Sequence, residues 1–220
     1  MSMRLGIIVV SLSLMISGCD RQENVQTDVL IYNPSVKQAW QSFNVEMAKK
    51  RPPLQFDSGK VVGDCIAYLK ESRHASISEG VNNQAMAGGY LICPTLSSIQ
   101  AAKPAAHVFS REKRLGKVLF DRLDVLSFPS SFNQRADAQH NTPRLLSDIS
   151  WKVGQYSITS DSEDWRISIE VVAELDVNGN GIPDLLLWFL DEAKDGNYKI
   201  YRVLEILDAK REGLLKAASI

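Results

Sequence analysis

Apolar residues recur at helical spacing through much of the first 150 positions of the chain. Val36, Trp40, Phe43 and Met47 are separated by three or four residues, which places them on one face of a helix. Stretches rich in Ser, Asn, Gly or Pro separate several such segments and are typical of loops. We therefore predict helices over 34–50, 61–73, 95–102 and 110–126, a helical turn over 143–149, and loops over 74–89 and 129–143.

From about residue 151 the pattern changes to the alternation that is typical of β-strands. Ile167, Ile169 and Val171 alternate with polar residues, so one face of this segment is apolar. Residues 185–190 are apolar without interruption, as expected of a central strand that is covered on both faces. The pattern predicts strands over 153–159, 165–173, 185–190 and 198–207.

Together these elements predict an α+β fold. We expect a helical N-terminal half, residues 34–150, packed on a C-terminal antiparallel β-meander, residues 151–210. Residues 34–220 would form a single globular domain. A segment of this length, in a chain of which 45% of the residues are hydrophobic, can bury one core.

The N-terminus has the order of features found in a secretory signal. Arg4 precedes an apolar run, Leu5–Ile16, that is too short to span about 30 Å of hydrocarbon as a helix. Small residues and Cys19 follow it. The Ile-Ser-Gly-Cys ending resembles the lipobox of bacterial lipoproteins. That resemblance implies that residues 1–18 are a cleaved signal peptide and that Cys19 carries diacylglycerol and an N-acyl chain such as palmitate. The alternative is an ordinary secretory signal with a chance Cys.

The lipobox also implies a location. Residues 19–33 would be the lipidated Cys and a tether, whose length of about 14 residues spans about 20 Å if it is flexible. Two or three acyl chains make anchoring effectively permanent, whereas one is reversible. Asp20 resembles the signal that retains enterobacterial lipoproteins in the inner membrane. We therefore expect a lipid-anchored protein on the periplasmic face, with the inner membrane favoured over the outer.

Charge and cysteine content agree with export. The signal peptide contains one of the 25 basic residues and none of the 26 acidic ones, so the mature chain has a net charge of about −2. This balance gives no reason to expect nucleic-acid binding, which requires a basic face. Cys65 and Cys93 remain, and in an oxidising compartment a disulfide is the economical prediction. The alternative is a thiol nucleophile or a metal-binding pair.

One segment has the pattern of a cation-binding loop. Asp176, Asn178, Asn180 and Asp184 place oxygen-bearing side chains at positions 1, 3, 5 and 9, and the Ile182 carbonyl could serve at position 7. Calcium takes six to eight oxygen ligands, and alternate short side chains can converge on one point. Position 12 is apolar, so this is not an EF-hand loop. The segment resembles the calcium loops of FG-GAP and integrin-type repeats, which join two strands. The alternative is a plain Asn-Gly turn.

Other catalytic patterns are absent from the sequence. There is no HExxH, no GxSxG and no glycine-rich phosphate loop. The segment 110–113 fits SxxK formally, but both companion motifs of penicillin-binding enzymes are missing, and Ser110 is better explained as a helix N-cap. His74, His107 and His140 share no flanking pattern. We therefore do not expect an enzyme.

The resulting functional hypothesis is a non-catalytic binding module on the membrane, with calcium as a tentative stabilising ion and an envelope protein as its partner. One alternative is an immunity or inhibitor protein against an envelope-targeting toxin or hydrolase, whose cleft an acidic loop such as residues 160–164 could fill. A second alternative is an envelope hydrolase.

Overall fold

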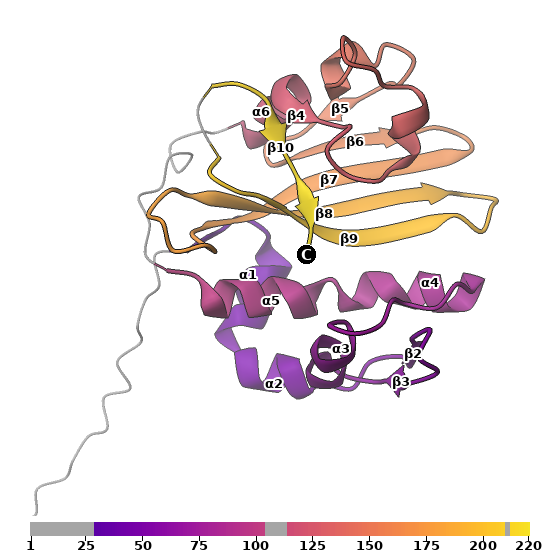
Figure 1. Ribbon diagram of the computed structural model, residues 1–220, viewed down its shortest axis with the longest axis vertical. Helices are drawn as coiled ribbons and strands as arrows, with labels where there is room; N and C mark the ends of the chain where they lie inside the picture. The colour runs from indigo at the N-terminus through magenta and orange to yellow at the C-terminus, as the bar shows by residue number, and fades with distance from the viewer. Residues whose placement is uncertain (1–28, 104–113, 210–211) are drawn as a thin grey trace, which may run out of the picture.

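A seven-stranded antiparallel sheet lies at the centre of the molecule (Figure 1). The computed structural model describes residues 29–103, 114–209 and 212–220. The strand order is β11-β9-β8-β7-β6-β5, and β1 pairs with β7 beyond the end of β6. The strands are β1 (Leu30–Ile31), β5 (Lys152–Val153), β6 (Ser157–Asp161), β7 (Trp165–Leu175), β8 (Asp184–Ala193), β9 (Lys199–Ile206) and β11 (Ala218–Ser219).

The long hairpin of β7 and β8 forms the middle of the sheet and is buried on both faces. Leu185, Leu187 and Phe189 belong to one hydrophobic cluster, whereas Leu186 lies in the cluster on the opposite face. The continuous apolar run of β8 therefore supplies both cores, as expected for a strand with a layer on each side. A bulge between Val171 and Ala173 shifts the register of this hairpin.

A layer of short helices covers one face of the sheet (Figure 1). Asn33 and Asp64 cap α1 and α3 by accepting backbone N–H groups of Val36 (3.0 Å) and Ala67 (2.9 Å). The elements of this layer are α1 (Pro34–Gln41), α2 (Phe43–Ala48), β2 (Leu54–Gln55), β3 (Val61–Val62), α3 (Cys65–Glu71), α4 (Val81–Ala87), the 3-10 turn η1 (Gly88–Tyr90) and α5 (Ile92–Ala101).

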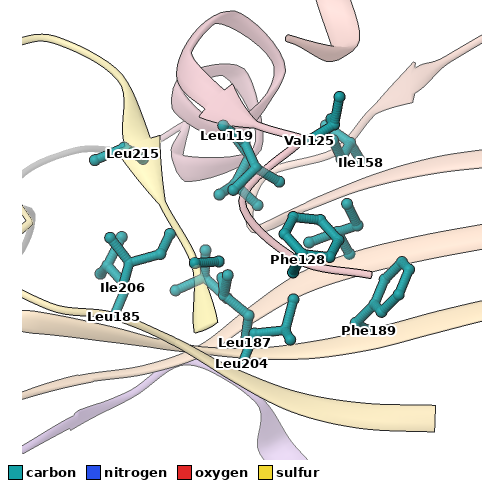
Figure 2. Packing of buried hydrophobic residues seen from close by; sticks show 14 of the residues in the cluster. Leu119, Val125, Phe128, Ile158, Leu185, Leu187, Phe189, Leu204, Ile206 and Leu215 are labelled. Atoms are coloured by element: carbon teal, nitrogen blue, oxygen red, sulfur yellow. The ribbon is translucent and has the colours of Figure 1, made fainter. Parts of the chain in front are cut away.

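A second layer covers the other face. In Figure 2, Leu119, Val125 and Phe128 approach the sheet from this layer, and the rings of Phe128 and Phe189 meet at 5.1 Å between centroids. Strand β10 runs parallel to β4 and closes one side of the layer. Its elements are α6 (Leu115–Arg122), β4 (Leu123–Asp124), the 3-10 turns η2 (Ser131–Gln134) and η3 (Pro143–Leu145), and β10 (Leu215–Lys216).

The predicted α+β arrangement, with a helical half packed on a C-terminal meander, is wrong. The sheet takes β1 from before the first helix and β11 from the chain end, so it is not a simple meander. Residues 115–150 do not join the other helices but lie on the opposite face. Helical periodicity shows that a segment has an apolar face. It does not show on which face of the sheet that segment packs. Because β8 is apolar on both sides, two covering layers are required.

Individual elements also differ from the predictions. The helix expected over 34–50 is interrupted at Ser42, and the one expected over 61–73 begins only at Cys65, after the Asp64 cap. Helix α4 lies inside the loop predicted over 74–89. Its Asn83 exchanges two hydrogen bonds with the Gln55 backbone (2.6 and 2.8 Å), so polar residues there serve tertiary contacts. The Ser110 N-cap lies outside the described residues.

Candidate functional site

The Asp176–Asp184 segment connects β7 to β8, as the strand-flanked motif predicted. Asp176 follows the last residue of β7, and Asp184 is the first residue of β8. Gly179 and Gly181 have φ of +76° and +80°, a left-handed conformation that glycine adopts without strain. These two glycines allow the chain to curl back toward Asp176.

The carboxylate of Asp176 organises the first half of the loop. Its side chain is 1% exposed. Oδ1 accepts the backbone N–H of Gly179 at 2.7 Å, and Oδ2 accepts that of Gly181 at 2.8 Å. Both curled residues are thus tied to the same carboxylate, which explains the spacing of the motif.

The carboxylate of Asp184 ties the loop to the next hairpin. It is fully buried, and its Oδ2 accepts the backbone N–H of Val177 at 2.7 Å. Its Oδ1 accepts the backbone N–H of Asp208 at 2.7 Å. Asp208 follows β9 and has a φ of +50°. The site therefore includes a third carboxylate, that of Asp208.

Asn178 and Asn180 each form hydrogen bonds through both the oxygen and the nitrogen of the side-chain amide. Their Oδ1 atoms accept backbone N–H groups two residues on: Asn178 from Asn180 (3.1 Å) and Asn180 from Ile182 (2.8 Å). Their Nδ2 atoms both donate to Oδ1 of Asp208, at 3.3 Å from Asn178 and 2.6 Å from Asn180. The side chain of Ile182 is exposed.

Negative charge accumulates in this loop. Burial raises the pKa of Asp184, the N–H groups of Val177 and Asp208 oppose that rise, and the charges of Asp176 and Asp208 add to it. The two carboxylates of the loop and that of Asp208 thus lie close enough to repel one another, and a bound cation would relieve this repulsion.

The loop has the donor chemistry for a hard cation, but its oxygens also close the loop on itself. Carboxylate and amide oxygens are the ligands that calcium prefers, and a carboxylate oxygen that accepts one N–H retains a second lone pair. Within the three described ranges, no group of three or more His, Cys, Asp or Glu side chains is placed so that it could hold a metal ion.

Asp208 is the residue of this site that sequence reasoning missed. It lies 24 positions from Asp184, outside the nine-residue motif. The register of the β8–β9 hairpin could have identified it. Leu185 pairs with Ile206, so the first residue of β8 and the residues just after β9 lie at the same end of the sheet. A two-strand alignment of 185–190 with 198–207 would have placed Asp208 near Asp184.

The predicted disulfide is confirmed. Cys65 and Cys93 are bonded, with their Cα atoms 5.0 Å apart, and both are fully buried. The bond joins α3 to α5 within the helical layer. The predicted lipidation site Cys19 and the signal peptide 1–18 lie outside the described residues.

The segment predicted as a tether extends into the fold at its C-terminal end. Leu30–Ile31 is strand β1, and the Tyr32 hydroxyl donates to Glu174 at 2.7 Å. Across the described ranges, none of the helices combines the length and apolar character needed to cross a membrane. Comparison with protein-family models, with curated proteins and with solved structures finds no match to this chain.

Proposed function

We propose that this protein is a bacterial lipoprotein, anchored through Cys19 on the periplasmic face of the membrane, whose domain acts as a non-catalytic binding module. The observation that carries the proposal is the order of features in the N-terminal segment: Arg4, the apolar run Leu5–Ile16, small residues and Cys19. The buried Cys65–Cys93 disulfide supports an oxidising compartment, since cytosolic proteins rarely retain one.

Chain length limits how far the domain reaches from the bilayer. Strand β1 begins at Leu30, so 11 residue steps separate it from Cys19. Fully extended, these steps cover at most about 40 Å. The partner we propose is therefore an envelope protein close to the same membrane.

The buried carboxylates support binding over catalysis. Asp176 and Asp184 each accept two backbone N–H groups, so their oxygens hold the loop in place. A general acid or base needs a carboxyl that reaches a substrate proton. We propose that Asp176 and Asp184 maintain the shape of the loop as part of a binding surface.

Membrane fractionation tests the anchor. The full chain should sediment with membranes and resist extraction by salt and alkali, whereas Cys19→Ala should accumulate as the uncleaved precursor. Asp20→Ser should move the mature protein from the inner to the outer membrane fraction if Asp20 is the retention signal. A wild-type chain found in the soluble periplasmic fraction would refute the anchor.

We propose further that calcium binds the 176–184 loop weakly, in the ~10⁻⁴–10⁻³ M range of extracellular modules. Asp176, Asp184 and the oxygens of Asn178 and Asn180 would hold it, together with the Ile182 carbonyl and Asp208. The ion would supply positive charge where three carboxylates repel one another.

Thermal unfolding tests the calcium proposal. Millimolar calcium should raise the Tm of the full chain, and Asp208→Asn should reduce that rise. Magnesium at the same concentration is the control for ionic strength. An unchanged Tm with calcium in the wild-type chain would leave the loop as a plain turn.

A further inference from the structure

A hollow of about 690 Å³ lies at the opposite end of the sheet from the 176–184 loop. Its walls come from the end of β6, the start of β7 and the turn between them, from Tyr198 just before β9, from residues between 130 and 150 of the second layer, and from Lys152 of β5. The volume falls within the range of about 300–1,000 Å³ that is typical of small-molecule sites. The proposed anchor and the calcium loop involve none of its residues.

One buried carboxylate fixes two aromatic rings of this hollow. Asp191 is fully buried, and its Oδ1 accepts the indole N–H of Trp165 at 2.7 Å. Its Oδ2 accepts the hydroxyl of Tyr198 at 3.0 Å. The two rings, 5.3 Å apart between centroids, both line the hollow. Ser131 donates its N–H and its hydroxyl to the same carboxylate (2.7 and 2.8 Å), which holds the second layer against this rim.

Ser160 offers an unused hydroxyl to the hollow. It is only 8% exposed and lines the wall next to Trp165 and Ile167. Within the described residues its hydroxyl makes no hydrogen bond, and its oxygen is not one of the fully buried atoms without a partner, so a ligand in the hollow can reach it. A ligand hydroxyl could both donate to this oxygen and accept from it.

Four of the five charged residues that line the hollow lie near an opposite charge, and the fifth, Asp164, makes no ion pair within the described residues. Arg135 pairs with Asp148 at 3.4 Å, and Asp161 pairs with Lys194 at 2.6 Å. The Lys152 charge also acts on Asp161 and helps to lower its pKa. Because these charges are close to opposite partners, the hollow does not present one sign of charge to a ligand.

We propose that this hollow binds a neutral saccharide. A pyranose ring has an apolar C–H face, which would lie on the ring of Trp165 or Tyr198, and a rim of hydroxyls, which would meet Ser160 and the wall carboxylates. Because Asp191 already holds both rings in place, less conformational entropy is lost when a ligand binds. This site is independent of the proposed membrane anchor, and it would add a glycan ligand to the protein partner.

Calorimetric titration tests the proposal. The full chain, in a zwitterionic detergent without a sugar headgroup, is titrated with chitobiose, cellobiose and maltose, and with a sulfated disaccharide as the charged comparison. At least one neutral disaccharide should bind saturably, with a Kd of about 1 mM or tighter. The sulfated disaccharide should not bind more tightly than its neutral counterpart.

Variants on the two faces of the sheet separate this hollow from the rest of the molecule. Trp165→Ala should abolish binding, and Ser160→Ala, which preserves packing, should weaken it at least tenfold. Trp188→Phe is the matched control, because this tryptophan lies on the opposite face and donates its indole N–H to Thr95 at 2.8 Å. Its binding should equal that of the wild type.

Three results would overturn the proposal. The first is no saturable binding of any neutral disaccharide up to about 10 mM. The second is preference for the sulfated disaccharide, and the third is binding that Ser160→Ala leaves unchanged. None of these outcomes bears on the result of membrane fractionation, so the proposed anchor and the proposed saccharide site are tested independently.

Discussion

At the scale of single residues, the buried carboxylates account for the most specific contacts of this protein. Asp191 accepts four hydrogen bonds and joins β7, the β8–β9 turn and η2. A fully buried carboxylate is tolerated only when such donors satisfy it. Sequence reasoning did not single it out, because it lies at the polar end of an apolar strand and its donors come from distant segments.

Removing the Asp191 carboxylate should be costly. Asp191→Ala leaves the half-buried donors of Ser131 and Trp165 without acceptors, so we expect the free energy of unfolding to fall by about 3 kcal/mol. Urea unfolding measures this. Asp195→Ala, in the exposed β8–β9 turn, is the control and should change stability by less than about 0.5 kcal/mol. Equal effects of the two substitutions would contradict the role given to Asp191.

The pKa of Asp184 should depend on Asp208. Burial and the neighbouring carboxylates raise it, so the folded state holds this proton more strongly than the unfolded chain does. Its titration therefore adds stability as the pH falls through the folded pKa, and that contribution is lost as the pH rises toward neutrality.

Carboxyl-carbon NMR titration measures this coupling. In Asp208→Asn the pKa of Asp184 should fall, because one of the charges that raise it is removed. Asp137→Asn, in a distant exposed turn, is the control and should leave the pKa of Asp184 unchanged. An Asp184 pKa that does not respond to Asp208→Asn would show that the two groups do not interact.

At the scale of elements, the strands were more predictable than the helices. Alternation predicted β7 and β9, and a continuous apolar run predicted β8, each to within a few residues. These patterns are clear because a buried face of a sheet must be apolar. The helices are short and depend on tertiary contacts. Helix α4 is an example, since its Asn83 fastens it to β2. Local sequence carries little information about such contacts.

One close approach between elements depends on a missing side chain. Helix α6 meets the β5–β6 turn at Gly116, where a Cβ would lie 2.3 Å from the Gly154 carbonyl oxygen and 2.4 Å from that of Ser157. Both neighbours are backbone atoms and cannot rotate away. The glycine is therefore required by the packing of α6 on the sheet.

Gly116→Ala should lower the free energy of unfolding by about 1–3 kcal/mol through this overlap. Gly89→Ala is the matched control, because a Cβ there meets nothing within 4 Å. We expect it to be neutral or stabilising by up to about 1 kcal/mol. Paired urea titrations compare them, and a Gly116→Ala protein as stable as the Gly89→Ala protein would disprove the close contact.

At the scale of the whole molecule, the sheet is shared by two cores. The sequence contained the reason, since β8 is apolar on both faces, but it did not say which helical segment lies on which side. The strands β1 and β11 also complete the sheet, and they are too short for a periodicity to detect. The sequence placed the 176–184 segment between two strands, as the structure has it, whereas the approach of Asp208 to that segment depends on the β8–β9 register.

The disulfide cross-links two helices of the same layer. It closes a loop with a sequence separation of 28 residues between α3 and α5. We expect the double substitution Cys65→Ala and Cys93→Ala to lower the free energy of unfolding by about 3–4 kcal/mol on the chain-entropy model. Reduction of the wild-type protein should have a similar effect, and reduction of the double variant should have none. Any response of the double variant to reductant would contradict this attribution.

The account rests most heavily on Cys19, because the anchor determines where the domain meets its partner. Intact-mass spectrometry of the protein extracted from membranes tests this directly. We predict a chain that begins at Cys19, lacks residues 1–18, and is heavier than its sequence by a diacylglyceryl group and an N-acyl chain. A chain that keeps residues 1–18, or one that is cleaved but carries an unmodified Cys19, would contradict the account.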